Sequence, residues 1–424
     1  MDLTATAPAC TCLRRAATGP RDWGLAPQRS ERPRDAREAA AALAAIAVAG
    51  EKAWVAGSAS RLAACPPVPA AAVVVESGGI AGIVAYEPAD QTLTVRAGTP
   101  LEEVHSLLEP DGLEIPGAHF GLADGTVGGM VATDLADGRR GRAGALRDRL
   151  LGMTVAGPDG RVTRSGGRVV KNVAGYDLMR LHAGAHGAFG LIAEVTLRLA
   201  PRPEAHAPFE RVLDDAVAAA GAAWRIAREA PALGLVGFVS HGTGPGRVVW
   251  VHEGDREWVD EGTRWSAAAF GAPLDTDAAE HQAAVEARLR LHALEHVCPG
   301  RTNVLVRGSL LPSRLPDLAR RLTGLALPAM GGHAQSGAAF ARIDLQAPDG
   351  RATLGTVTRT IEELGGAWKV AGAWTPDDGP AGADGVIAPW GGIETPWDLY
   401  GRLKDAFDPA RSLGPLAYAI GRPG

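Results

Sequence analysis

The segment Thr126-Val127-Gly128-Gly129-Met130-Val131-Ala132-Thr133 decides the fold of this chain. Two adjacent glycines are followed by small and apolar residues in a helical pattern, so the backbone can pass directly beneath a ring or a pyrophosphate. Arg139 and Arg140 follow shortly after, and a guanidinium group can meet phosphate as a fork. The segment therefore predicts a nucleotide-binding loop, with a purely structural role for its glycines as the alternative.

Two more segments have the residues to approach a dinucleotide. Gly57-Ser58-Ala59-Ser60 follows a predicted strand at 53–55, and the string 171–178 is continued by the glycine-rich string 184–192. Lys171 stands beside Asn172 and is one of only four lysines in 424 residues. A cation and backbone N–H groups suit phosphates. An ordinary turn and a solvated surface lysine remain the alternatives.

Two other nucleotide motifs are excluded. The chain has no G-x-x-x-x-G-K-[ST] string. Its nearest Rossmann-like string, Gly242-Thr243-Gly244-Pro245-Gly246, precedes a predicted strand at 248–252, where the fingerprint would precede a helix. We therefore predict a hairpin turn there, which argues against a nicotinamide cofactor.

Around these loops, periodicity and turn residues predict an α+β chain. Thr99-Pro100-Leu101-Glu102 opens one helix as a capping box with Thr99 as the cap, and Gly112 ends that helix. Leu191, Ala193, Val195, Leu197 and Leu199 would share one face of a strand. The other elements up to residue 201 are a helix at 35–48, strands at 71–76, 82–86 and 92–96, and a hairpin of 152–156 with 161–164.

Pro201 and Pro203 mark a domain boundary. Beyond it the pattern predicts helices at 212–229, 278–294, 312–323 and 352–364, and strands at 233–239, 247–252, 302–307, 338–345 and 367–372. A last helix lies near 398–407.

Composition limits the class of protein. The chain is 46% hydrophobic and 21% charged with a net charge of −5, which fits a soluble globular protein and gives no reason to expect nucleic acid. No apolar run reaches transmembrane length, and residues 1–27 read as a flexible tail without a signal peptide. Four cysteines, including Cys10 and Cys12, point to a reducing, cytoplasmic compartment, and their spacing does not fit an iron–sulfur site.

The three loops together resemble the FAD-binding fold of the vanillyl-alcohol-oxidase (PCMH-type) flavoprotein family. Within that family they are similar to the E subunits of bacterial glycolate oxidase (glycolate dehydrogenase). The strings that carry the resemblance are 126–132, 170–178 and 187–197, and it returns faintly at 390–391 and 403–409. The chain departs from the family after Phe407-Asp408-Pro409, where Leu413-Gly414-Pro415 replaces the usual Asn-Pro-Gly-Arg.

The resemblance implies a PCMH-type FAD-binding domain at 28–201, made of two α+β subdomains at about 28–112 and 113–201. An α+β cap or substrate domain would follow at 202–384, and 385–424 would return to the FAD domain. No His in the first loop invites covalent attachment, so FAD would be bound non-covalently. The implied FAD contacts are Gly57, Ser58, Ala59, Ser60, Gly117, Thr126, Gly128, Gly129, Ala132, Thr133, Arg139, Arg140, Lys171, Asn172, Gly190, Leu191 and Ile192.

The same resemblance implies oxidation of glycolate or a related 2-hydroxy acid, with hydride transfer to flavin. By residue type and position, His119, Tyr176, Arg140 and His182 are candidates for the base or the carboxylate-binding cation. The His-Ala-Gly-Asp-Gly-Asn string of the family's catalytic D subunit is absent. The implied partners are therefore a second FAD-containing subunit and an iron–sulfur subunit, through which the chain would attach peripherally to the inner membrane. A non-catalytic FAD-binding assembly or electron-relay subunit and a stand-alone FAD-linked oxidase are the alternatives.

Overall fold

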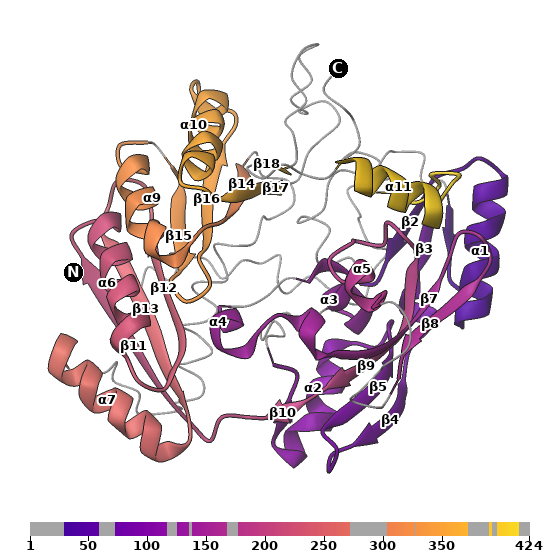
Figure 1. Ribbon diagram of the computed structural model, residues 1–424, viewed down its shortest axis with the longest axis horizontal. Helices are drawn as coiled ribbons and strands as arrows, with labels where there is room; N and C mark the ends of the chain where they lie inside the picture. The colour runs from indigo at the N-terminus through magenta and orange to yellow at the C-terminus, as the bar shows by residue number, and fades with distance from the viewer. Residues whose placement is uncertain are drawn as a thin grey trace. The chain divides into compact units, whose positions relative to one another are not determined.

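The computed structural model describes residues 29–58, 73–116, 125–134, 138–167, 177–271, 303–325, 327–371, 390–391 and 397–414. The chain divides into two compact units (Figure 1). The first unit comprises Met1–Ala136, Ala145–Pro201 and Pro396–Gly424, and the second comprises Asp137–Gly144 and Arg202–Thr395. The sequence analysis placed 137–144 in the FAD domain, whereas the structure groups this segment with the second unit.

The first unit begins with a small parallel sheet in the order β1-β3-β2. Its strands are β1 (Arg29–Glu31), β2 (Ala53–Ala56) and β3 (Val73–Glu76). Helix α1 (Ala36–Val48) starts at Asp35, whose carboxylate accepts hydrogen bonds from the backbone N–H groups of Arg37 and Glu38. Its buried face packs on β3 and on the neighbouring larger sheet.

That larger sheet is antiparallel, in the order β4-β5-β9-β7-β8. Helices α2 (Leu101–Leu108) and α3 (Val127–Thr133) bury their apolar sides against it. The strands are β4 (Ile83–Glu87), β5 (Thr92–Arg96), β7 (Leu150–Ala156), β8 (Val162–Gly166) and β9 (Leu191–Arg198), and a short pair joins β6 (Leu113–Glu114) to β10 (Ala200–Pro201). The unit also contains the helices α5 (Met179–His182) and α11 (Trp397–Phe407), with 3₁₀ turns at Ser77–Gly79, Glu109–Asp111 and Leu146–Arg149.

Two details of this unit differ from the sequence prediction. Pro100 is the N-cap of α2, and Thr99 makes no cap hydrogen bond. The Thr99 hydroxyl accepts instead from the backbone N–H of Gly82, 2.8 Å away, and so ties the helix entrance to the turn before β4. Strand β9 does not present its five predicted residues to one core. Leu191 and Ala193 pack in the α1 cluster, and Val195, Leu197 and Leu199 in the α2 and α3 cluster, because the register shifts within the β7–β9 pairing.

The second unit is built on an eight-stranded sheet in the order β11-β13-β12-β15-β16-β14-β17-β18. All its strand pairs are antiparallel. The strands are β11 (Ala205–Leu213), β12 (Leu233–Ser240), β13 (Gly246–Gly254), β14 (Asn303–Ser309), β15 (Ala329–His333), β16 (Ala338–Asp344), β17 (Ala367–Ala371) and β18 (Trp390–Gly391). The helices are α4 (Arg140–Ala143), α6 (Ala216–Glu229), α7 (Arg256–Phe270), α9 (Leu315–Leu322) and α10 (Gly350–Glu363), with a 3₁₀ turn at Pro312–Arg314.

Helices α6, α9 and α10 cover one face of this sheet and form its main core (Figure 1). The turn at 242–246 joins β12 to β13 as a hairpin, as the sequence predicts. The sequence analysis missed β11, α7 and β15, and β11 occupies the region where the predicted helix 212–229 begins. The predicted helix 278–294 lies outside the described residues.

Candidate functional site

Two of the three predicted loops meet in the first unit. A β-carbon on Gly57, just after β2, would overlap Oγ1 of Thr126 and lie 3.2 Å from its Cβ. Thr126 also forms a β-bridge with Pro100, and the N–H of Leu101 donates to the carbonyl of Gly125. The two loops therefore approach each other closely only because residue 57 has no side chain.

Thr126 also fixes the start of α3. Its hydroxyl oxygen accepts from the N–H of Gly129, 3.2 Å away. A β-carbon on Gly128 would lie 2.7 Å from the β-carbon of Ala97, and the Gly128 N–H donates to the Ala97 carbonyl at 2.7 Å. Gly128 thus serves the packing of α3 on the end of β5. Gly129 is half-buried, so its backbone is the part of the glycine pair that a ligand can reach.

The third segment joins the other two. The N–H groups of Gly184 and His186 donate to the carbonyls of Val131 and Ala132 in α3. Gly187 has φ +80°, and a β-carbon on it would lie 3.1 Å from the β-carbon of Val55 in β2. Gly190 has φ +148°, which favours glycine. The loop before β9 is therefore held against both β2 and α3.

The three segments form a cradle of backbone whose close contacts depend on glycine at positions 57 and 187. A glycine-rich backbone of this kind fits the pyrophosphate of a dinucleotide, which is bound mainly through backbone N–H groups. Leu191 and Ile192 are buried in the two hydrophobic clusters, so their side chains serve the core, while Thr133 donates to the carbonyl of Gly129. Ala59, Ser60, Gly117, Lys171 and Asn172, with the catalytic candidates His119 and Tyr176, lie outside the described residues.

The two predicted phosphate-binding arginines belong to the second unit. Arg139 is 4% exposed, and its Nε donates to Oε1 of the fully buried Glu253 at 2.8 Å. Arg142 donates to the Glu253 carbonyl, and Nδ1 of His206 lies 3.7 Å from the other carboxylate oxygen. The charge of Arg139 thus has a protein partner that the sequence could not indicate. Arg140 is half-buried, and its predicted role stays a prediction.

His182 has a structural environment. It is 5% exposed and makes edge contacts with Phe189 and Phe407, at ring-centroid distances of 6.4 Å and 6.2 Å. Burial lowers the pKa of His182 from 6.5 to about 4, so the imidazole is neutral near pH 7. A weakly basic ring packed between two phenyl groups does not suit a general base.

We expect His182 to make the free energy of unfolding depend on pH in the acid range. Between pH 6.5 and 4 the unfolded chain binds a proton at this imidazole that the folded chain does not bind. The contribution of His182 to the free energy of unfolding is therefore fully present above pH 6.5 and is lost as the pH drops toward 4. The full loss is about 3 kcal/mol. His182→Phe keeps an aromatic ring and should flatten this part of the profile, measured by urea unfolding at pH 4 to 7. Parallel profiles for variant and wild type would contradict the buried, neutral imidazole.

Two arginines lie on one face of the eight-stranded sheet in the second unit. This is the face opposite the one that α6, α9 and α10 cover. Leu305 in β14 and Phe340 in β16 belong to the small cluster on that face, so the alternation of strands places Arg307 and Arg342 there too. Arg307 is paired with Phe340 and Arg342 with Leu305 on adjacent strands, and both arginines are half-buried. Both residues take part in interactions within the protein.

Comparison with known proteins identifies the cofactor-binding domain of the chain. Residues 27–166 match the model of a family described as an FAD binding domain, and these residues include the first two loops of the cradle. The chain is thus a flavoprotein with an FAD-binding domain, and the predicted cofactor, FAD, is confirmed.

Two individual proteins show which flavoproteins the chain is similar to in sequence. The chain is 42% identical over 132 residues to glycolate oxidase subunit GlcE of Escherichia coli, covering 31% of this chain and 37% of that protein. It is 36% identical over 118 residues to D-2-hydroxyglutarate dehydrogenase of Xanthomonas citri, covering 28% of this chain and 25% of the relative. The chain therefore spans well under half the length of these curated relatives.

The FAD-binding family model and the solved structures together confirm the predicted fold class, α+β with a PCMH-type FAD-binding fold. An alkyldihydroxyacetonephosphate synthase matches with a TM-score of 0.60 at 14% identity, covering 90% of this chain and 75% of that one. This similarity concerns the fold alone. Among the described residues, no helix is both long and apolar enough to cross a bilayer.

Proposed function

We propose that this chain is the FAD-binding subunit of a glycolate oxidase-type complex that oxidises glycolate or a related 2-hydroxy acid to the 2-oxo acid. The observation that carries the proposal is the close approach of Gly57 to Thr126 and of Gly187 to Val55, in a chain that is 42% identical over 132 residues to GlcE. Other relatives are also named for 2-hydroxy acids, among them D-lactate and D-2-hydroxyglutarate dehydrogenases.

The cradle would hold FAD non-covalently, and FAD supplies the hydride acceptor when bound. The chain's own residues supply positioning. Gly57 and Gly187 let the loops approach Thr126 and Val55 closely, and the Thr126 hydroxyl fixes the start of α3. In the proposal, Lys171 and Asn172 add polar groups to this site.

A 2-hydroxy acid also needs a cation for its carboxylate and a base for its hydroxyl proton. Arg140 remains the candidate for the cation, and His119 and Tyr176 remain the candidates for the base.

We further propose two partners, a second FAD-containing subunit and an iron–sulfur subunit, which would carry electrons away. The chain lacks the D-subunit string, and the described residues contain no group of His, Cys, Asp or Glu that could hold a metal. We place the complex in the cytoplasm, attached peripherally to the inner membrane through its partners. A non-catalytic assembly or electron-relay subunit is the second candidate, favoured by the same missing string. A stand-alone FAD-linked oxidase is the third.

The visible spectrum of the purified chain tests these possibilities. We expect a flavin spectrum that moves to the supernatant on acid precipitation, and bleaching by glycolate only when the partner subunits are present. Bleaching of the isolated chain by glycolate would indicate a stand-alone oxidase. A flavin that stays unbleached in the complex while the partner flavin is reduced and reoxidised would support the assembly role. Colour in the acid pellet would contradict non-covalent binding.

A further inference from the structure

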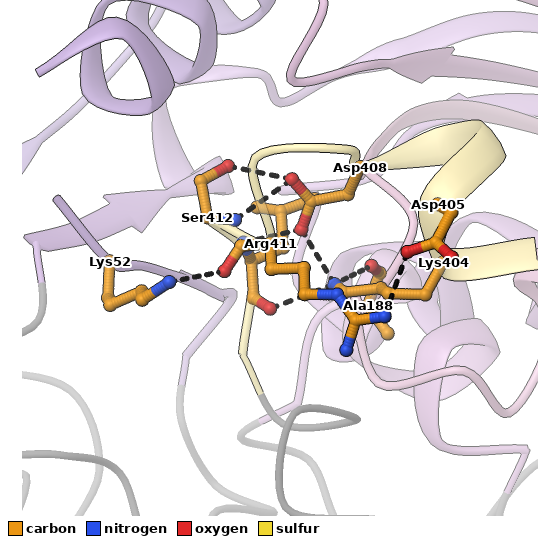
Figure 2. A network of polar contacts seen from close by, with 8 residues as sticks. Lys52, Ala188, Lys404, Asp405, Asp408, Arg411 and Ser412 are labelled. Carbon is orange, nitrogen blue, oxygen red and sulfur yellow. Dashed lines mark hydrogen bonds and ion pairs between the residues drawn. The ribbon is translucent and has the colours of Figure 1, made fainter. Parts of the chain in front are cut away.

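The end of helix α11 carries an ion pair, between Lys404 and the residue just after the helix, Asp408, that is almost completely removed from water. Lys404 is 1% exposed and Asp408 is 0% exposed, and Nζ lies 2.7 Å from Oδ2 (Figure 2). Burying two charges is unfavourable unless every donor and acceptor finds a partner. The partners of this pair therefore show what it holds in place.

The ammonium group of Lys404 has three acceptors for its three protons. Besides Asp408, Nζ donates to the carbonyl of Ala188 at 2.7 Å and to the carbonyl of Leu413 at 2.9 Å. The Asp408 carboxylate accepts from the N–H and hydroxyl of Ser412 and from the N–H of Leu413, at 2.8–3.0 Å. The pair thus joins α11 to two other segments of the first unit.

One of these segments is the loop of the FAD cradle that precedes β9. Ala188 lies between Gly187 and Gly190, 216 residues before Lys404. The next residue, Phe189, contacts Phe407 of α11 at a ring-centroid distance of 5.8 Å. Helix α11 therefore holds this loop through a charged hydrogen bond and through an aromatic contact.

The other segment, 411–414, runs beside β2. The Ala53 N–H donates to the Ser412 carbonyl at 2.6 Å, and the Gly414 N–H donates to the Ala53 carbonyl at 3.0 Å. Lys52 adds a hydrogen bond from Nζ to the Arg411 carbonyl at 2.7 Å (Figure 2). Strand β2 leads directly into Gly57, so both ends of the network reach segments of the cradle.

We propose that the Lys404–Asp408 pair positions the FAD cradle, by holding the Gly187–Gly190 loop and the start of β2 at the separation that the cofactor needs. Segment 397–414 is then part of the FAD site, although it lies outside the residues that match the FAD-binding family. Lys404 is a positioning residue and needs no contact with the cofactor. This inference rests on FAD as the cofactor.

The experiment measures FAD dissociation constants of the apoprotein by flavin fluorescence, and thermal unfolding without FAD. Lys404→Met should raise the dissociation constant at least tenfold, because the Ala188 carbonyl loses its donor. Lys404→Met/Asp408→Asn removes both charges and keeps an amide oxygen for Ser412. Its apoprotein should therefore unfold closer to the wild-type temperature while its FAD dissociation constant stays raised.

The matched control is the exposed pair of Asp405 and Arg411, which joins α11 to the same segment. Their atoms lie 2.8 Å apart, and the side chains are 62% and 45% exposed. Asp405→Asn should leave both measurements unchanged. Wild-type-like FAD binding by a folded double variant would overturn the positioning role alone, whereas a wild-type chain that takes up no FAD would overturn the cofactor assignment as well.

Discussion

Gly57→Ala is expected to weaken FAD binding at least tenfold, which corresponds to about 1.4 kcal/mol. The added methyl group would overlap the hydroxyl of Thr126 and lie 3.2 Å from its Cβ. Thr126 cannot rotate away freely, because its hydroxyl accepts from the Gly129 N–H at the start of α3. The two loops must then separate. Fluorescence titration of the apoprotein with FAD measures the loss.

Two variants make this test specific. Gly167→Ala is the matched control in the same unit, since no atom lies within 4 Å of a β-carbon at that position. Gly57→Ala/Thr126→Ala removes the overlapping hydroxyl. Its loss of FAD-binding free energy should therefore be smaller than the sum of the losses in the two single variants. Gly57→Ala with wild-type affinity would show that the cradle does not bind the cofactor.

Arg139→Met is expected to destabilise the second unit by about 3–5 kcal/mol, the usual cost of breaking a buried ion pair. Glu253 would keep a fully buried carboxylate without the guanidinium 2.8 Å away. Arg139→Met/Glu253→Gln should regain much of that stability because no isolated buried charge is left. Urea unfolding followed by tryptophan fluorescence gives the free energies.

The exposed pair of Arg225 and Glu229 on α6 provides the control in the same unit. These side chains are 57% and 49% exposed, so Arg225→Met should cost no more than about 1 kcal/mol. The Arg139 experiment also decides between two roles. Unchanged unfolding with weaker FAD binding would favour the phosphate contact that the sequence predicts, whereas lost stability with normal FAD binding would favour the ion pair.

The sequence by itself determined the features that depend on neighbouring residues. The predicted helix at 35–48 forms α1 after Asp35, the turn at 158–160 joins β7 to β8, and the 242–246 string closes a hairpin. Each follows from the local conformational preferences of Asp, Pro or Gly, which act over a few residues. The glycines at 128 and 129 likewise indicate a close backbone approach.

Only the tertiary structure decided which distant groups meet. Arg139 and Glu253 are 114 residues apart, and Lys404 and Ala188 are 216 apart. The sequence shows Arg139 beside a glycine-rich loop, which suggests phosphate, and shows Lys404 simply as one of four lysines. Periodicity and turn chemistry report local geometry, but the partner of a charge is selected by burial. A charge removed from water must find its counterpart wherever the fold brings one within reach.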